Sequence, residues 1–93
     1  RRGGVDTEYR SDRIRRIASR FLRPDESAGS TDDLLTCWCV KEAVYKLRSA
    51  SHLAYDQMRV HLDTATADDL LAADSLSFGR EITADYVLVW TSE

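Results

Sequence analysis

Two carboxylates near the start of the chain, Asp6 and Glu8, are spaced so that they could share a cation. They lie in residues 5–8, a segment after two glycines that is predicted to be a short strand. Successive side chains of a strand point to opposite faces, so Asp6 and Glu8 project from the same face. Two carboxylates at that spacing repel each other unless water or a cation lies between them.

Three charged residues, Lys41, Glu42 and Lys46, lie in a segment that otherwise has the composition of a buried helix. Residues from about 32 to 48 are apolar on nearly every side of a helical wheel, which predicts a largely enclosed helix. Charges in such a helix are costly unless a partner compensates them. Glu42 and Lys46 are four residues apart, so the plainest interpretation of this pair is a helix salt bridge worth roughly a few tenths of a kcal/mol.

A first helix is predicted between the strand and the buried helix. Ser11 is a plausible N-cap for it, Pro24 ends it, and Ser30 or Thr31 caps the second helix. Its apolar residues recur at helical spacing and are Ile14, Ile17, Ala18, Phe21 and Leu22. Its outer face is rich in arginine, which is either a solvated surface or a docking surface for an acidic partner.

The second half of the chain is predicted to form strands. Apolar and polar residues alternate over residues 58–62, and residues 75–83 form a second candidate with Gly79 as a bulge or bend. Residues 86–90 are apolar on both faces, which favours an interior strand. Residues 65–74 fit a short helix or a long hairpin loop equally well. These elements predict an α+β fold with two main helices packed on a small, mainly antiparallel sheet.

Three short motifs occur in order along the first half of the chain. They are Gly4-Val5-Asp6-Thr7-Glu8, then Arg20-Phe21-Leu22 with Glu26, then Trp38-Cys39-Val40-Lys41-Glu42-Ala43 with Lys46. In this order and spacing the chain resembles the 4'-phosphopantetheinyl transferase superfamily, and specifically the second half of its two-half type. Each motif alone is weak evidence, whereas three in the right order are specific. The rest of the chain agrees only in its strand-rich character.

The resemblance implies a magnesium-dependent transferase of the cytoplasm. Members of this family move the 4'-phosphopantetheine arm of coenzyme A onto a serine of an acyl or peptidyl carrier protein and release adenosine 3',5'-bisphosphate. The expected cofactor is therefore Mg²⁺, coenzyme A is a substrate, and the carrier protein is the partner.

The motifs also imply roles for individual residues. Asp6, Glu8 and Glu42 would hold Mg²⁺, a cation that prefers oxygen ligands in octahedral geometry. Lys41 and Lys46 would contact the phosphates of coenzyme A. A carboxylate or a metal-bound water would accept the proton of the carrier serine, and Glu26 is the candidate carboxylate. The expected catalytic residues are Glu26, Glu42 and Lys46.

Composition argues against several other functions. The 93-residue chain has a formal net charge of -3 and a pI near 5.3, which argues against non-specific nucleic-acid binding. No apolar run approaches the roughly 18 residues of a membrane span, and no signal-peptide pattern is visible. Cys37 and Cys39 are expected to be buried free thiols, because residues two apart on a helix point in different directions.

Residues 1–93 are predicted to be a single half-domain of a longer chain. The N-terminal half of two-half enzymes, which contributes a histidine and further coenzyme A contacts, has no counterpart here, and a second copy of the chain could take its place. The glycine that commonly follows the second lysine is also missing after Lys46. The alternative function is a non-catalytic interaction module that keeps the fold, and an isolated half could be inactive.

Overall fold

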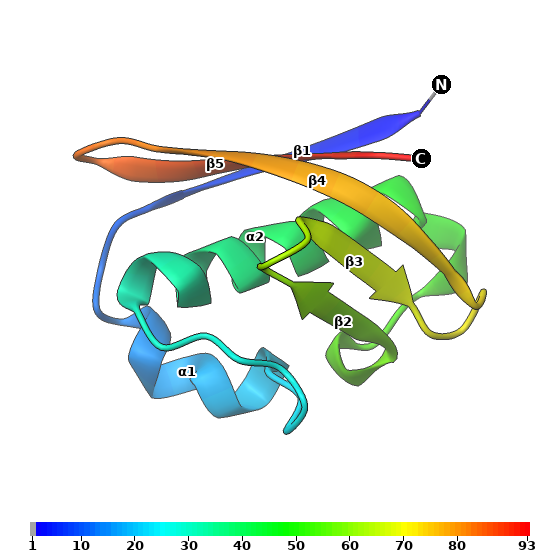
Figure 1. Ribbon diagram of the computed structural model, residues 1–93, viewed down its shortest axis with the longest axis horizontal. Helices are drawn as coiled ribbons and strands as arrows, with labels where there is room; N and C mark the ends of the chain where they lie inside the picture. The colour runs from blue at the N-terminus through cyan, green and yellow to red at the C-terminus, as the bar shows by residue number, and fades with distance from the viewer. Residues whose placement is uncertain (1) are drawn as a thin grey trace.

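Helix α2 (Thr31–Leu47) is the element around which the other elements pack. In this computed structural model, which describes residues 2–93, the chain forms two α-helices, two short 3₁₀ helices and five strands (Figure 1). The remaining elements are β1 (Gly3–Tyr9), α1 (Ile14–Phe21), η1 (Ser49–Ser51), η2 (Tyr55–Gln57), β2 (Met58–His61), β3 (Thr66–Asp69), β4 (Asp74–Ile82) and β5 (Tyr86–Ser92). The first and last strands lie side by side, so the two ends of the described chain are neighbours.

The five strands form one antiparallel sheet in the order β1-β5-β4-β3-β2. Figure 1 shows this sheet curving over α2, with α1 on the far side of that helix. The predicted α+β fold, with two main helices on an antiparallel sheet, is confirmed. The strand predicted at residues 86–90 is also confirmed as interior, since β5 lies between β1 and β4.

The core lies between α2 and the inner face of the sheet. Helix α2 begins where predicted, because the Ser30 hydroxyl accepts a hydrogen bond from the Asp33 N–H at 3.0 Å. The strands contribute a buried set to this core: Met58, Val60, Ala67, Leu76, Phe78, Val87 and Val89. The outer face of the sheet is different, since Val5, Tyr9 and Trp90 are exposed there.

Three local predictions need correction. Helix α1 begins at Ile14 without a side-chain cap, and the Ser11 hydroxyl bonds the Arg13 N–H in the preceding turn instead. Residues 66–69 form a strand rather than a helix or loop. Gly79 makes no bulge, because the β4–β5 register runs through it unbroken. Its missing side chain instead makes room for Trp90, whose ring would lie 2.4 Å from a Cβ at that position.

The two cysteines lie in α2 and belong to the core. Cys37 and Cys39 are both free and buried, as predicted. Burial raises the pKa of the Cys37 thiol to about 12 and that of the Cys39 thiol still further, so both stay protonated.

Across residues 2–93, none of the helices combines the length and the apolar character needed to cross a bilayer.

Candidate functional site

Strand β1 lies directly against α2 at Gly4. A Cβ built on Gly4 would lie 2.6 Å from the Ala43 carbonyl oxygen and 3.1 Å from the Thr91 hydroxyl. Only glycine allows the strand and the helix to approach this closely. Since side chains alternate along a strand, the residues two and four positions after Gly4, which are Asp6 and Glu8, also face the helix.

Asp6 and Glu8 of β1 meet Glu42 and Lys46 of α2 in what we call the seam cluster. Both β1 carboxylates are half-buried, whereas the alternating Val5 and Thr7 side chains are exposed. The Lys46 ammonium donates to Asp6 Oδ1 at 2.6 Å. The prediction that Asp6 and Glu8 project from the same face is therefore confirmed. The alternative interpretation, an i, i+4 salt bridge between Glu42 and Lys46, is not what forms, because Lys46 pairs with Asp6 across the helix and the strand.

The seam cluster carries an excess of negative charge. Burial, the Asp6 carboxylate and the Glu42 carboxylate together raise the pKa of Glu8, and Lys46 only partly offsets them. The hydrogen bond to Asp6 raises the pKa of Lys46, which stays charged. Three carboxylates near one ammonium, which bonds Asp6, create a negative potential that attracts a further cation.

Carboxylate oxygens are the donors that Mg²⁺ prefers, so the seam cluster fits this ion in its chemistry. As the side chains stand, however, no three His, Cys, Asp or Glu side chains within residues 2–93 are close enough to hold one ion together. The Lys46 ammonium bonded to Asp6 partly compensates the carboxylates in this arrangement. Metal binding at Asp6, Glu8 and Glu42 would therefore require their side chains to rotate toward one another.

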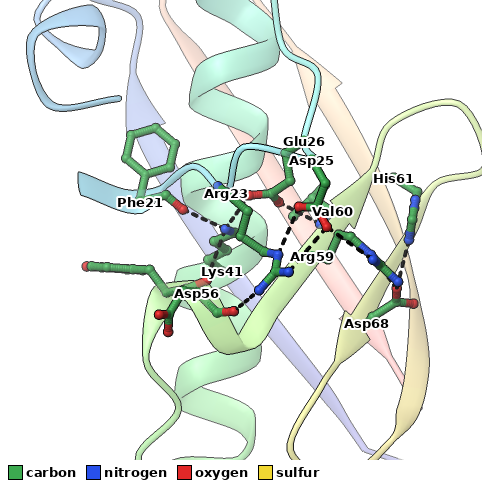
Figure 2. Close-up of polar contacts among 11 residues, drawn as sticks. Phe21, Arg23, Asp25, Glu26, Lys41, Asp56, Arg59, Val60, His61 and Asp68 are labelled. Carbon is green, nitrogen blue, oxygen red and sulfur yellow. Dashed lines mark hydrogen bonds and ion pairs between the residues drawn. The ribbon is translucent and has the colours of Figure 1, made fainter. Parts of the chain in front are cut away.

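Lys41 and Glu26 form an ion pair inside the protein, which we call the interior pair (Figure 2). The Lys41 side chain has 0% exposure, and its ammonium donates to Glu26 Oε1 at 2.6 Å, to the Phe21 carbonyl at 2.6 Å and to the Tyr55 carbonyl at 3.1 Å. Glu26 in turn accepts from the backbone N–H groups of Arg23 and Val60, each at 2.7 Å. The pair thus ties the loop after α1 to α2 and β2.

This geometry corrects the expected positions of two site residues. Lys41 uses its three donors inside the protein, so it has no surface to offer to a phosphate of coenzyme A. Glu26 also has 0% side-chain exposure and lies on the interior side of α2, so it cannot meet a carrier serine in this arrangement. Consecutive helical residues point about 100° apart, and this is why Lys41 and Glu42 lie in different regions.

Exposed ion pairs extend from the same loop to β2 and β3 (Figure 2). The Arg23 guanidinium and, more weakly, the Arg59 guanidinium bond Asp25 and lower its pKa to about 2. Arg59 also pairs with Asp68, which His61 contacts through Nε2 at 2.8 Å. This second network places the half-exposed His61 in a structural contact with Asp68.

A recess of about 350 Å³ opens beside Glu8, between β1, α1 and α2. Its lining is Glu8, Tyr9, Ser11, Arg13, Ile14, Ile17, Leu35 and Trp38. Arg13 begins a stripe of exposed arginines that continues with Arg16 and Arg20 at helical spacing. No ion pair engages these three side chains within residues 2–93. The sequence indicated the arginine-rich face, but no pattern in it indicated the recess.

Carboxylates gathered beside an exposed lysine on an α+β domain are the elements of a site for a divalent cation and a phosphorylated ligand. A family model described as the 4'-phosphopantetheinyl transferase superfamily matches residues 2–90. The chain therefore belongs to this superfamily, and the match extends well beyond the three motifs. It indicates a function of the phosphopantetheinyl transferase type. Searches of curated proteins and of solved structures found no match.

Proposed function

We propose that this protein transfers the 4'-phosphopantetheine arm of coenzyme A to a serine of an acyl or peptidyl carrier protein, with Mg²⁺ held by Asp6, Glu8 and Glu42. The observation that carries the proposal is the seam cluster, in which carboxylates of β1 and α2 lie near one ammonium, that of Lys46, which bonds Asp6. When bound, Mg²⁺ would neutralise charge on the pyrophosphate and on the leaving oxygen.

The residues of the seam cluster have complementary tasks in this reaction. The serine oxygen attacks the phosphorus next to the pantetheine arm, a new P–O bond forms, and the old one breaks to release adenosine 3',5'-bisphosphate. Lys46, whose side chain is 56% exposed, can leave Asp6 and donate to a phosphate of coenzyme A. Since Glu26 is enclosed, a carboxylate of the seam cluster is the better candidate to accept the serine proton.

The arginine stripe on α1 supports a carrier protein with an acidic surface as the partner. Arg13 lines the recess beside Glu8, and Arg16 and Arg20 extend the positive surface away from it. Exposed like charges steer an oppositely charged partner and fix its orientation. Exchange of Arg16 and Arg20 for glutamate is expected to raise the KM for the carrier and leave coenzyme A binding unchanged.

A direct assay tests the reaction. The protein is incubated with Mg²⁺, coenzyme A and several apo carrier proteins, and intact-mass spectrometry follows the gain of the arm. Transfer that stops on chelation of the metal, and that fails in Glu42→Gln, is the expected result. A chain that binds neither coenzyme A nor a divalent cation would instead favour the non-catalytic interaction module.

Lys46→Ala tests the phosphate contact separately from chemistry. Loss of one charge-assisted hydrogen bond should weaken coenzyme A binding roughly tenfold or more, and the salt dependence of binding should decrease. Lys46→Arg keeps the charge and serves as the control. Calorimetric titration at two salt concentrations measures both effects, and an unchanged affinity in Lys46→Ala would remove this residue from the proposed site.

Two further expectations stay predictions. One is the cytoplasmic location, and the other is that residues 1–93 are one half of a longer domain or assemble with a second copy. Exposed Val5, Tyr9 and Trp90 on the outer face of the sheet are compatible with such a contact. Sedimentation of the purified chain would test it, and a well-behaved monomer with full transferase activity would contradict it.

A further inference from the structure

The Glu42 carboxylate is held by a residue that belongs to none of the three motifs. The Tyr55 hydroxyl donates to Glu42 Oε1 at 2.9 Å, across a separation of 13 residues in the sequence. Within residues 2–93 this is the hydrogen bond that the Glu42 side chain makes. One carboxylate oxygen is therefore engaged by the protein, and the other is left for an external partner.

Tyr55 is itself fixed by contacts on both its backbone and its ring. Its carbonyl accepts from the buried Lys41 ammonium at 3.1 Å, so the interior pair holds the start of η2. Its ring lies 5.5 Å from the Trp38 ring, and Trp38 packs edge-on against Phe21 at 5.3 Å. These contacts place the hydroxyl without help from the seam cluster.

The geometry points to Tyr55 as the positioning residue for Glu42. A half-buried glutamate has three rotatable bonds and, among like charges, would otherwise turn toward water. The Tyr55 hydroxyl bonds one oxygen and so keeps the carboxylate from turning out to water, while the other oxygen stays free to turn toward Asp6 and Glu8 when a cation binds. The interior pair thus acts on the seam cluster through Tyr55. This inference rests on the proposed role of Glu42 as a metal ligand.

Tyr55→Phe tests this role because it removes the hydroxyl and keeps the ring against Trp38. Mn²⁺ serves as a probe for the Mg²⁺ site, and the loss of its free electron paramagnetic resonance signal reports binding without any turnover. The expected result is roughly tenfold weaker Mn²⁺ binding. This is the lower end of the loss found when a residue that hydrogen-bonds a metal-binding side chain is removed. The apparent Mg²⁺ requirement of transfer should rise, whereas the KM for coenzyme A should not.

Matched variants separate the positioning role of Tyr55 from any effect of the substitution on folding. Tyr86→Phe deletes the hydroxyl of another half-buried tyrosine, on β5, and should bind Mn²⁺ as the wild type does. Circular dichroism and melting curves check that Tyr55→Phe is folded, and Tyr55→Met supplies a second hydroxyl-free side chain in case it is not. In the Glu42→Gln background, Tyr55→Phe should cause little further loss, because the two residues act as a pair.

The outcomes distinguish this inference from the proposed function. Weaker Mn²⁺ binding in Glu42→Gln, together with wild-type binding in Tyr55→Phe, would overturn the role of Tyr55 alone. Equal Mn²⁺ binding by the wild type and Glu42→Gln, or none by the wild type, would overturn the metal site and the Tyr55 role with it. Additive losses in the double variant would also overturn the coupling between Tyr55 and Glu42.

Discussion

Lys41 and Glu42 are consecutive residues of α2, yet they lie in two regions with opposite properties. Lys41 is fully buried, and the interior pair satisfies each of its donors with a protein acceptor. Glu42 is half-buried in the seam cluster, where burial and the neighbouring carboxylates raise the pKa of Glu8. The charges of the interior pair balance each other and are buried from solvent. Those of the seam cluster are mostly negative and partly exposed to solvent.

The difference predicts which region stabilises the fold and, under the proposed function, which one binds a ligand. A buried pair whose bonds are complete is costly to break, because the surviving partner is left as an isolated charge. Like charges gathered on a surface reduce stability slightly, and they persist where a ligand compensates them. The interior pair is therefore expected to matter for folding, and the seam cluster for binding.

Lys41→Met should break the interior pair and produce the largest effect. It leaves Glu26 charged and buried, which is expected to cost about 3–5 kcal/mol of unfolding free energy. Urea unfolding measures the loss. Lys46→Met is the matched control, since it removes the only other lysine, which is exposed, and should change stability by about 0–1 kcal/mol.

A second variant shows whether the unpaired charge of Glu26 causes the loss of stability in Lys41→Met. Glu26→Gln combined with Lys41→Met should recover part of the stability, because no buried charge remains unpaired. If Lys41→Met were as stable as the wild type and yet bound coenzyme A weakly, the phosphate contact predicted from the sequence would be correct after all.

Gly4→Ala should disturb the seam cluster by forcing β1 away from α2. The added methyl would lie 2.6 Å from a backbone oxygen, which cannot move aside as a flexible side chain could. Overpacking of this kind is expected to cost about 1–3 kcal/mol, and Mn²⁺ binding should weaken as Asp6 shifts. Thermal melts and Mn²⁺ titration measure the two effects.

Gly29→Ala is the control for this change. No atom lies within 4 Å of a Cβ at Gly29, and no described glycine has a positive φ, so this alanine should be nearly neutral. Equal losses in the two variants would show that close packing at Gly4 is not what positions the strand.

The fold could be predicted from the sequence wherever one strong periodic signal or cap was present. A cap at Ser30 or Thr31 located the start of α2, and the alternation over residues 58–62 identified β2. Residues 66–69 could not be assigned, because the inward-facing Asp69 hides the alternation of a strand. Its burial depends on two backbone N–H groups in the turn that follows, those of Leu71 and Ala72, and on Arg48 at 2.7 Å. The contact with Arg48 is distant in the sequence and leaves no local pattern.

Part of the candidate site could also be predicted, again where a periodic pattern was present. Alternation along β1 was enough to put Asp6 and Glu8 on one face. The helical wheel could not say which side of α2 faces water and which faces the core, and the family motif assigned both Lys41 and Lys46 to phosphates of coenzyme A. Tyr55 was missed, since its role depends on a turn that brings it back to α2, and no motif in the sequence marks that turn.

Glu8→Gln should have the smallest effect on stability and the opposite sign to Lys41→Met. Burial, Asp6 and Glu42 raise the pKa of Glu8 above its ordinary value of 4.5, so the folded protein binds this proton more tightly than the unfolded chain does. The free energy of unfolding therefore falls as the pH rises from about 4.5 through the raised pKa. Without divalent cations, Glu8→Gln should remove this slope and stabilise the protein at neutral pH by roughly 0.2–1 kcal/mol, while Mn²⁺ binding is lost. Urea unfolding across pH in the presence of chelator measures this, with Glu81→Gln, at an exposed position of β4, as the control. A Glu8→Gln protein less stable than the wild type at every pH would mean that the seam cluster stabilises the fold, and the contrast between the two regions would fail.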